Sequence, residues 1–450
     1  VSAGAFLAGL GTRTSISAGL AMAQIGEFSF IIAGLGVASG SPAPDGMVLW
    51  TRLVAPGFLD TLGEAPVPVR WEVAHDEGFT RIAQRGETVA SADLAHSMHA
   101  EVQGLAPDRW YFYRFIAGGV ASPAGRTRTL PAPQAAVARL RVAYASCQRW
   151  EHGHYAAWRH LREEGVDFVL FLGDYIYEYP NTAVALRNFP TLGLATTLAD
   201  YRERYALYRS DAALRAMHAA CPWLLAWDDH EVQNDYAGLH GGDDRPVGLN
   251  AARDFPARRA AAYQAWYEHM PVRAAAFARA AVGGQLRLHA RHRFGRLADL
   301  LVLDTRQWRD LQPCGRPGRP AGLVDPAACA ALADPARSLL GAAQERWLDE
   351  QVASGAAWSL EGQHAGHAGQ GARRLVQPAQ AGEVHAGGEL LHRLAGQVVR
   401  LVHHQQAVGQ LGQHACIHAR QQQVVVGDDH VGIGQLAAGA VVGAFVEVRA

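Results

Sequence analysis

Side chains that can bind metal ions follow three apolar segments of the sequence, at the point where each segment ends. Cys147 follows LRVAYAS, and Asp174 and Tyr177 follow VDFVLFLG. The segment CPWLLAW is followed by a third set, Asp228, Asp229, His230 and Asn234. Buried carboxylates carry a large desolvation penalty unless they are paired or bind a metal. Packing alone therefore does not explain this grouping, which predicts a metal site.

The kinds of donor indicate which metals the site would hold. The thiolate of Cys147 and the phenolate of Tyr177 are both anionic, and tyrosinate is a known iron ligand in proteins. Carboxylate and amide oxygens suit calcium or another hard divalent ion. The donor set therefore predicts ferric iron, Fe3+, beside calcium, Ca2+.

A parallel sheet would bring these donors together. Continuous apolar strands separated by helices indicate such a sheet, buried on both faces. Ligand sites then lie beyond the carboxyl ends of the strands. The strands expected here end near residues 146, 172 and 227. Helices are expected at 154–164, 197–209, 211–219, 254–269 and 339–353, and two further strands are expected to meet at Gly295.

The first part of the chain, residues 36–131, reads as a β-sandwich. VPVRWEVAHD alternates apolar and polar residues, and MHAEVQGL and RWYFYRFIAG form two more strand-like runs. Short strands at this spacing are typical of a sandwich. The pattern from Leu105 to Arg114 is common in fibronectin-like sandwiches, where the tyrosine is a corner residue. We assign no chemistry to this domain, and residues 131–133 are expected to form a stiff linker.

Several stretches resemble blocks of the PhoD-type alkaline phosphatases, in the order of that family. The similar blocks are YASCQRWEHGHYAAWRHL, VDFVLFLGDYIYEY, LADYRERYALYRSDAALRAMHAACPWLLAWDDHEVQNDYAG, VLDTRQWRDLQPCG and LLGAAQERWLDEQ. GVASGSPAPDGMVLWTRL is similar to the N-terminal sandwich of the same family, so the resemblance covers about residues 36–358. It implies a β-sandwich followed by an α/β metallophosphoesterase-like domain at 140–358, expected to be incomplete at its C-terminus. The implied activity is metal-dependent phosphoester hydrolysis with metal-activated hydroxide.

The resemblance also implies a role for the donors on the first two strand ends. Cys147 and Tyr177 would bind ferric iron, and Asp174 would bridge iron and calcium and take part in catalysis. The alternatives are an inert buried thiol at Cys147, a packed ring at Tyr177 and a structural cap at Asp174.

The third strand end has implied roles as well. Asn234 would bind calcium, and Asp229 stands where related metallophosphoesterases often place a metal-binding Asn. His230 would act in catalysis by contacting the substrate phosphate or by positioning the site. A turn residue at Asn234 and a pairing role for Asp229 are the alternatives.

The two ends of the chain differ from the middle. Residues 1–35 resemble a transmembrane segment of Kef-type cation/proton antiporters, mainly through AQIGEFSF, and membrane contact is expected only through residues 1–37. No paired arginine precedes this run, so no export signal is evident. A joined or vestigial fragment is the alternative interpretation of this stretch.

Residues 359–450 are unrecognised and contain one aromatic residue, Phe445, so a tail of low order is expected. VVVGDDHVG nevertheless has the form of a second metal-binding strand end, with Asp428 and His430 as candidate ligands. Two other hypotheses for the whole chain stay open. One is an inactive chimeric or truncated product that lacks the C-terminal metal ligands, and the other is a membrane-transport fragment.

The bulk composition limits the possible partners. The net charge is −1, which argues against a nucleic-acid-binding surface.

Cys314 and Cys329 flank a Pro/Gly-rich loop and could form a disulfide, which would fit an exported enzyme. The family resemblance implies a periplasmic or secreted protein that acts, as a monomer, on phosphate monoesters or diesters.

Overall fold

The computed structural model describes residues 36–54, 62–180, 186–187, 193–242, 254–277, 286–314, 328–352, 358–364, 390–394, 397–403 and 442–449. The antiporter-like segment predicted at 1–35 and the candidate ligands Asp428 and His430 lie outside the described residues. In the described part of the chain, no helix combines the length and the apolar character needed to cross a membrane.

The first domain is a sandwich of two antiparallel layers, as predicted. One layer contains β1 (Val37–Ala43), β2 (Gly46–Arg52) and β5 (Ser97–Val102). The other contains β3 (Val67–Ala74), β4 (Ile82–Ala90), β6 (Trp110–Ala117), β7 (Val120–Ala121) and β8 (Gly125–Arg128). Leu49 and Met98 from the first layer share a buried core with Phe115 from the second. The backbone N–H of Ala106 donates to the Tyr111 hydroxyl at 3.0 Å, so Tyr111 is the predicted corner tyrosine.

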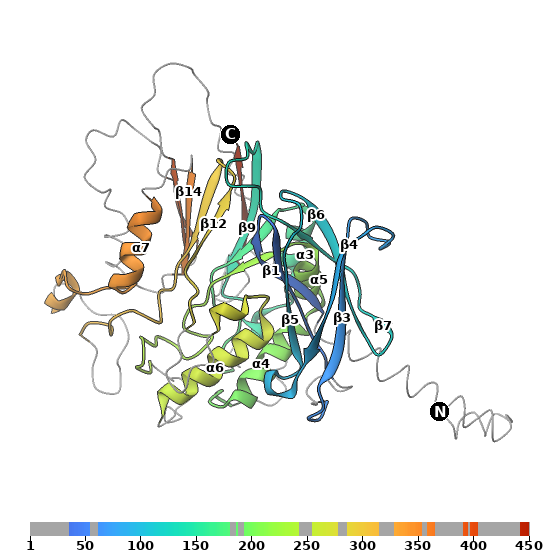
Figure 1. The fold of residues 1–450 in the computed structure, drawn as a ribbon. Coiled ribbons are helices and arrows are strands. Elements are labelled where there is room, and N and C mark those ends of the chain that lie inside the picture. The colour runs from blue at the N-terminus through green and yellow to red at the C-terminus, as the bar shows by residue number, and fades with distance from the viewer. Residues whose placement is uncertain are drawn as a thin grey trace, which may run out of the picture.

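The first layer of the sandwich continues into the sheet of the second domain (Figure 1). This sheet contains three parallel strands, β9 (Arg139–Ser146), β10 (Phe168–Phe171) and β11 (Trp223–Leu225). Strand β11 also pairs in parallel with β1, through Trp223 and Gly40. A Cβ atom at Gly40 would lie 2.5 Å from the carbonyl oxygen of Pro271, so the close approach requires glycine. The two domains therefore share one seven-stranded sheet.

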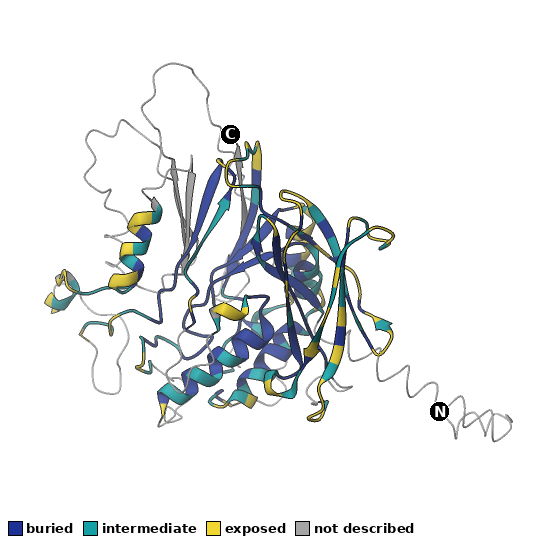
Figure 2. Cartoon of the chain, viewed as in Figure 1, coloured by how far each residue is buried: buried dark blue, intermediate teal, exposed yellow. Residues whose placement is uncertain are grey.

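The parallel strands are buried on both faces, as their continuous apolar sequences predict. Phe168 and Leu170 of β10 face a second sheet, while Val169 and Phe171 face a core lined by helices. Figure 2 shows these strands as buried, with exposed residues on the outer sandwich strands and on the outer faces of helices.

The described residues form five α-helices close to the predicted positions. They are α3 (Ala156–Glu163), α4 (Leu198–Arg209), α5 (Ala212–Ala220), α6 (Phe255–His269) and α7 (Ala342–Val352). The first four share the core beside the parallel strands, and the fifth packs against Leu301 and Leu303. Short 3-10 turns are η1 (Ala92–Leu94), η2 (Trp150–His152), η3 (Ala274–Ala276) and η5 (Ala330–Ala333). The side chains of Thr197, Asp211 and Asp254 cap the starts of α4, α5 and α6 by accepting backbone N–H bonds. Helices α4 and α6 lie side by side (Figure 1).

The second sheet includes strands from the region beyond residue 358. Its order is β12 (Ala290–Phe294), β13 (Ala298–Val302), β14 (Trp358–His364), β16 (Gln397–His403) and β15 (Leu390–Leu394). Strands β12 and β13 form the antiparallel pair predicted on either side of Gly295. A last strand, β17 (Val442–Arg449), pairs with β9 at the edge of the first sheet. The division of the chain at residue 358 therefore stays a proposal, since four strands beyond that boundary take part in the two sheets.

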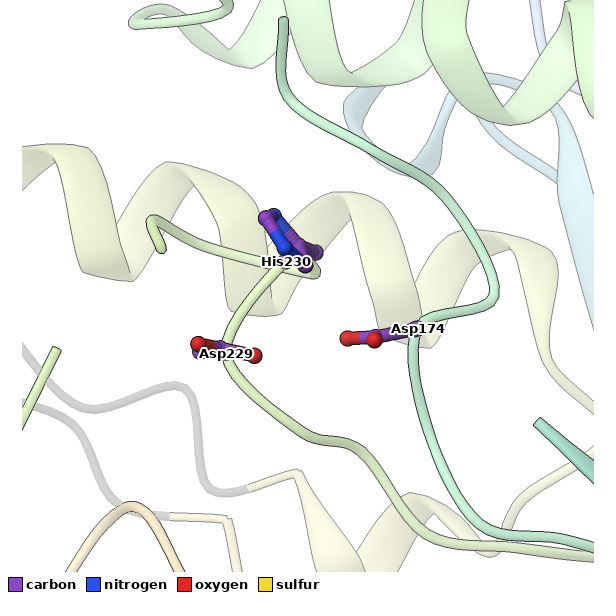
Figure 3. Close-up of side chains that lie close together, drawn as sticks. All are labelled: Asp174, Asp229 and His230. Carbon is purple, nitrogen blue, oxygen red and sulfur yellow. The ribbon is translucent and has the colours of Figure 1, made fainter. Parts of the chain in front are cut away.

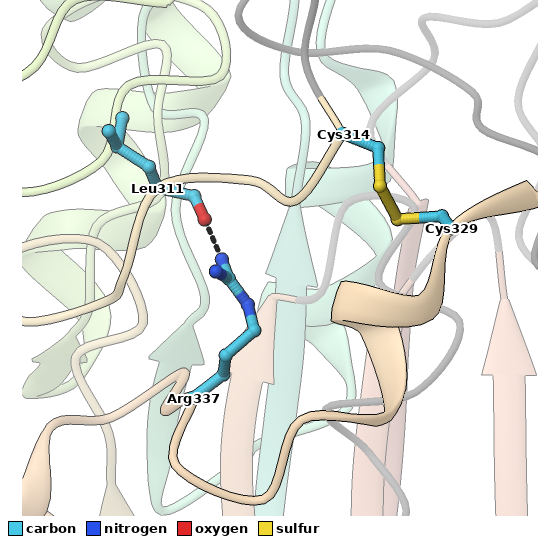
Figure 4. The surroundings of a disulfide bond; sticks show 4 residues. All are labelled: Leu311, Cys314, Cys329 and Arg337. Carbon is cyan, nitrogen blue, oxygen red and sulfur yellow. Dashed lines mark hydrogen bonds between the residues drawn. A yellow bond between two sulfur atoms is a disulfide. The ribbon is translucent and has the colours of Figure 1, made fainter.

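A disulfide joins Cys314 and Cys329, as the sequence suggested (Figure 4). Beside it, the guanidinium of Arg337 donates to the carbonyl oxygen of Leu311. These contacts tie the segment that follows β13 to the segment that leads into α7.

Candidate metal centre

The loops after β9 and β10 lie against each other and carry the first candidate ligands. Cys147 and Asp174 both adopt left-handed backbone conformations, with φ of 58° and 57°. The backbone N–H of Cys147 donates to the carbonyl oxygen of Gly173 at 3.2 Å, and the N–H of Gln148 donates to that of Asp174 at 3.2 Å. These bonds fix the two strand ends relative to each other. Left-handed conformations are uncommon outside glycine and often mark functional sites.

The side chains of Cys147, Asp174 and Tyr177 meet at one carboxylate oxygen. The Cys147 sulfur lies 3.3 Å from Asp174 Oδ2, and the Tyr177 hydroxyl lies 3.2 Å from the same atom. The other oxygen, Asp174 Oδ1, is buried and has no hydrogen-bond partner in the part of the chain that the structure describes. A buried carboxylate oxygen without a partner is costly, and a bound cation would satisfy it. The structure thus brings these three residues together, while their role as ligands stays a prediction.

Asp229 and His230 complete the cluster from the loop after β11 (Figure 3). One potential ligand atom from each of Asp174, Asp229 and His230 lies within 4.8 Å of the other two, and all three residues are buried. Asp229 Oδ2 accepts a hydrogen bond from the backbone N–H of Asp235 at 2.6 Å, which fixes the carboxylate. The geometry and the donor types therefore fit a metal ion.

Glu178 holds the loop after β11 by two contacts. One of its oxygens lies 2.7 Å from His230 Nδ1, and the other accepts the backbone N–H of Asn234 at 2.6 Å. His230 Nε2 is left without a hydrogen bond to the described residues. Burial disfavours the charged imidazole, but the carboxylates of Glu178, Asp174 and Asp229 outweigh it and raise the pKa of His230 well above its usual range.

Asn234 lies on the same loop as Asp229. Its side-chain amide donates to Asp235 Oδ2 at 3.5 Å, and its backbone is fixed by Glu178. Neither contact uses the side-chain oxygen of Asn234, which is the atom that would bind calcium. A metal-binding role for Asn234 therefore stays a prediction.

Glu231 lies in the loop after β11 and holds the loop after β10 in place. Its carboxylate accepts the backbone N–H of Tyr175 at 2.6 Å and that of Asp228 at 2.8 Å. Burial, and then the charge of Asp174, raise the pKa of Glu231 to about 8. Sequence reasoning missed both Glu178 and Glu231. The available signal was their position, since each closely follows a candidate ligand in DYIYE and DDHE.

Arg149 was also missed, and it packs on the tyrosine side of the cluster. Its guanidinium carbon lies 4.1 Å from the centre of the Tyr177 ring and 4.7 Å from that of Tyr179. Burial, then the charges of Asp174 and Cys147, raise the pKa of the Tyr177 phenol well above its usual range, and Arg149 opposes them. A metal ion at Asp174 would reverse this balance, because a cation favours the phenolate.

Asp228 does not contribute to the metal cluster, although the sequence grouped it with the candidate donors. Its Oδ1 lies 2.5 Å from Arg306 Nε, and both side chains are 1% exposed. The neighbouring residue, Asp229, does belong to the cluster, together with Asp174 and His230. Burial raises the pKa of Asp229 to about 7, with Arg306 lowering it and Asp228 raising it.

The chain is similar to known proteins over most of its length. The family described as "PhoD-like phosphatase" matches residues 142–388, and the one described as "PhoD-like phosphatase, N-terminal domain" matches residues 26–131. Alkaline phosphatase D of Bacillus subtilis (strain 168) is 45% identical over 371 residues, which cover 79% of this chain and 61% of that protein. A solved structure described as "Structure of PhoD" is 44% identical with a TM-score of 0.69, and the match covers 75% of this chain and 63% of that one. The chain therefore spans about three fifths of the length of these relatives.

Proposed function

The chain belongs to the PhoD-like phosphatase family, and on that premise we propose that it hydrolyses phosphoesters with metal ions held at Asp174. One observation carries the proposal. Among the described residues, Asp174 Oδ1 is buried without a hydrogen-bond partner, while its Oδ2 lies within 3.3 Å of a thiol and a phenol. A cation would satisfy Oδ1.

We propose that the first metal is ferric iron and the second is calcium. Cys147 and Tyr177 contact the same oxygen of Asp174, and two anionic donors of this kind suit a trivalent ion. Asp229 lies on the other side of the cluster, where carboxylate oxygens suit calcium. Asn234 would be the further calcium ligand in this proposal, and Asp174 would help to hold both ions.

When bound, the metals would activate water and neutralise the phosphate oxygens during displacement at phosphorus. The side chains of this chain position the substrate in that reaction. Glu178 holds the His230 ring through Nδ1, and Nε2 makes no hydrogen bond with the described residues. We therefore assign His230 contact with the substrate phosphate through Nε2. No side chain is assigned as a nucleophile.

The cellular setting and the substrate class belong to the same proposal. The disulfide between Cys314 and Cys329 suits an oxidising compartment, which supports a periplasmic or secreted protein. We propose that the enzyme acts as a monomer on phosphate monoesters or diesters. Asp428 and His430, outside the described residues, are proposed as additional ligands.

The proposal predicts that Asp174→Asn abolishes hydrolysis. Loss of an outer partner of a metal ligand costs about 10- to 100-fold in activity, so loss of a bridging ligand should cost at least about 100-fold. Turnover of p-nitrophenyl phosphate and of bis-p-nitrophenyl phosphate measures the effect and compares monoesters with diesters. Asp349→Asn, on the exposed face of α7, is the matched control.

Removing the metals from the wild-type protein should have the same effect as the substitution. Activity should fall on treatment with a chelator and return with iron and calcium. Unchanged turnover in Asp174→Asn would refute the assignment of the site. A wild-type chain that neither binds metal nor hydrolyses either ester would instead favour the inactive chimeric or truncated product.

A further inference from the structure

Arg306 lies buried among the acidic residues of the loop that follows β11. Its Nε lies 2.5 Å from Asp228 Oδ1, its Nη2 lies 3.4 Å from Asp229 Oδ2, and its Nη1 lies 3.9 Å from Asp235 Oδ1. The guanidinium is 1% exposed, so solvent screens these interactions little. Three carboxylates of one loop therefore surround a single buried cation.

The backbone that carries Arg306 is fixed independently of these carboxylates. Asp304 accepts the backbone N–H groups of Arg306 at 3.0 Å and of Gln307 at 2.9 Å. The backbone N–H of Asp304 in turn donates to the side chain of Gln344 in α7 at 2.8 Å. Strand β13 and helix α7 thus set the position of the guanidinium, and the loop after β11 must adapt to it.

The contacts of Arg306 divide the acidic pair into two roles. Asp228 is fully buried and takes the short contact with Nε. Asp229 takes the longer contact through Oδ2, which also accepts the N–H of Asp235, and its Oδ1 makes no hydrogen bond with the described residues. We propose that Arg306 is a positioning residue that neutralises Asp228 and orients Asp229 so that Oδ1 of Asp229 can bind a metal ion. This inference rests on the proposed function.

The chemistry of the guanidinium explains why arginine occupies this position. Two adjacent buried carboxylates repel each other and also repel Asp174 nearby, so an internal cation lets the loop hold its shape before a metal binds. The planar fork of arginine contacts two carboxylates at fixed angles, whereas the ammonium group of lysine acts as a point charge. Lysine at this position would keep the charge but hold only one aspartate well.

The test replaces the ion pair by a neutral amide pair in the full chain, as Asp228→Asn/Arg306→Gln. Replacing both members of the close pair leaves no unpaired charge at position 228, and Asp229 keeps its hydrogen bond from the Asp235 N–H, so we expect the chain to fold. Bound calcium and iron are measured by elemental analysis after dialysis against graded calcium buffers. We expect the calcium concentration for half-saturation to rise about 10- to 100-fold, as for other outer partners of metal ligands. Iron content should match the wild type, because Cys147 and Tyr177 are untouched.

A second variant, Arg306→Lys, provides the same test if the double variant does not fold. It should also bind calcium more weakly, while kcat at saturating calcium changes less than about threefold, because the loss affects metal loading. Arg291→Met is the matched control, since Arg291 pairs with Asp299 at 2.5 Å on the β12–β13 hairpin. It should bind calcium like the wild type.

The outcomes separate this inference from the proposed function. Calcium half-saturation within about twofold of the wild type, in a folded double variant or in Arg306→Lys, would show that Arg306 is only structural. A wild-type chain that binds no calcium and hydrolyses no phosphoester would instead overturn the proposed function.

Discussion

The carboxylate of Asp174 has two oxygens in different surroundings. Oδ2 contacts the Cys147 thiol and the Tyr177 hydroxyl, and Oδ1 is buried with no hydrogen bond from any described residue. A residue that only capped the strand end would use its oxygens for backbone N–H groups, as Glu231 does nearby. At the scale of single residues, the Glu231 carboxylate therefore binds backbone N–H groups, whereas the Asp174 carboxylate keeps an oxygen that a metal ion can bind.

Protons compete with metal ions for the same groups, which predicts a pH dependence. The pKa of the Asp229 carboxyl is raised to about 7, chiefly by burial, so below that pH the carboxyl carries a proton that a metal must displace. Calcium affinity should thus rise with pH, about tenfold between pH 6 and pH 8, and level off above about pH 8. Calcium half-saturation at several pH values measures this. A constant value from pH 6 to pH 8 would contradict it.

Part of this residue-level account follows from the sequence. Cys147, Asp174 and Tyr177 were predictable because each donor follows an apolar strand, and parallel strands end at one edge of a sheet. The division between Asp228 and Asp229 was not predictable, because it depends on Arg306, which lies about 78 positions along the chain from Asp228. An ion pair between residues so far apart in the chain leaves no recognisable pattern in the sequence around either one.

At the scale of elements, the turn after β10 is the feature that sets the site. Gly173 has φ +112°, and a Cβ atom there would lie 2.3 Å from the backbone nitrogen of Asp228. The loops after β10 and β11 can approach this closely only with glycine. The strands and helices themselves were predictable from apolar runs and caps such as Thr197 and Asp211. The pairing of β11 with β1 was not, because it joins Trp223 to Gly40 across the whole sandwich.

Gly173→Ala should therefore disrupt the site through its backbone. The added methyl group meets backbone atoms that cannot move aside, and the left-handed φ is unfavourable for alanine. We expect a loss of about 2–4 kcal/mol in the free energy of unfolding, together with reduced metal content. Chemical denaturation and elemental analysis measure the two effects. Gly193→Ala is the control, since its Cβ would meet nothing within 4 Å; equal behaviour of the two variants would count against this account.

At the scale of the whole molecule, the sandwich and the catalytic part share one hydrogen-bonded sheet. The order β10–β11–β1–β2 runs from the candidate ligands into the first domain without a break. The indole N–H of Trp50 in β2 also donates to the carbonyl oxygen of Glu268 in α6 at 3.0 Å. The sequence predicted a sandwich and an α/β domain joined by a stiff linker at residues 131–133, and it could not show that their strands pair.

The shared sheet predicts that the two domains unfold together. Calorimetry of the full chain should give one transition for both, with a calorimetric enthalpy close to the van't Hoff enthalpy. Neither domain can leave the sheet without exposing the paired edges of β1 and β11. A separate transition for the sandwich, well below that of the catalytic part, would show that this pairing contributes little to stability.

The visible absorption spectrum of the purified chain tests the central claim most directly. If Cys147, Asp174 and Tyr177 hold one ferric ion, the wild type should show a tyrosinate–iron band, and Tyr177→Phe should lose it. Tyr179→Phe is the control and should keep the band. Tyr179 lies two residues after Tyr177, and its ring packs against the Arg149 guanidinium. A colourless, iron-free wild type, or a band that survives in Tyr177→Phe, would contradict the account.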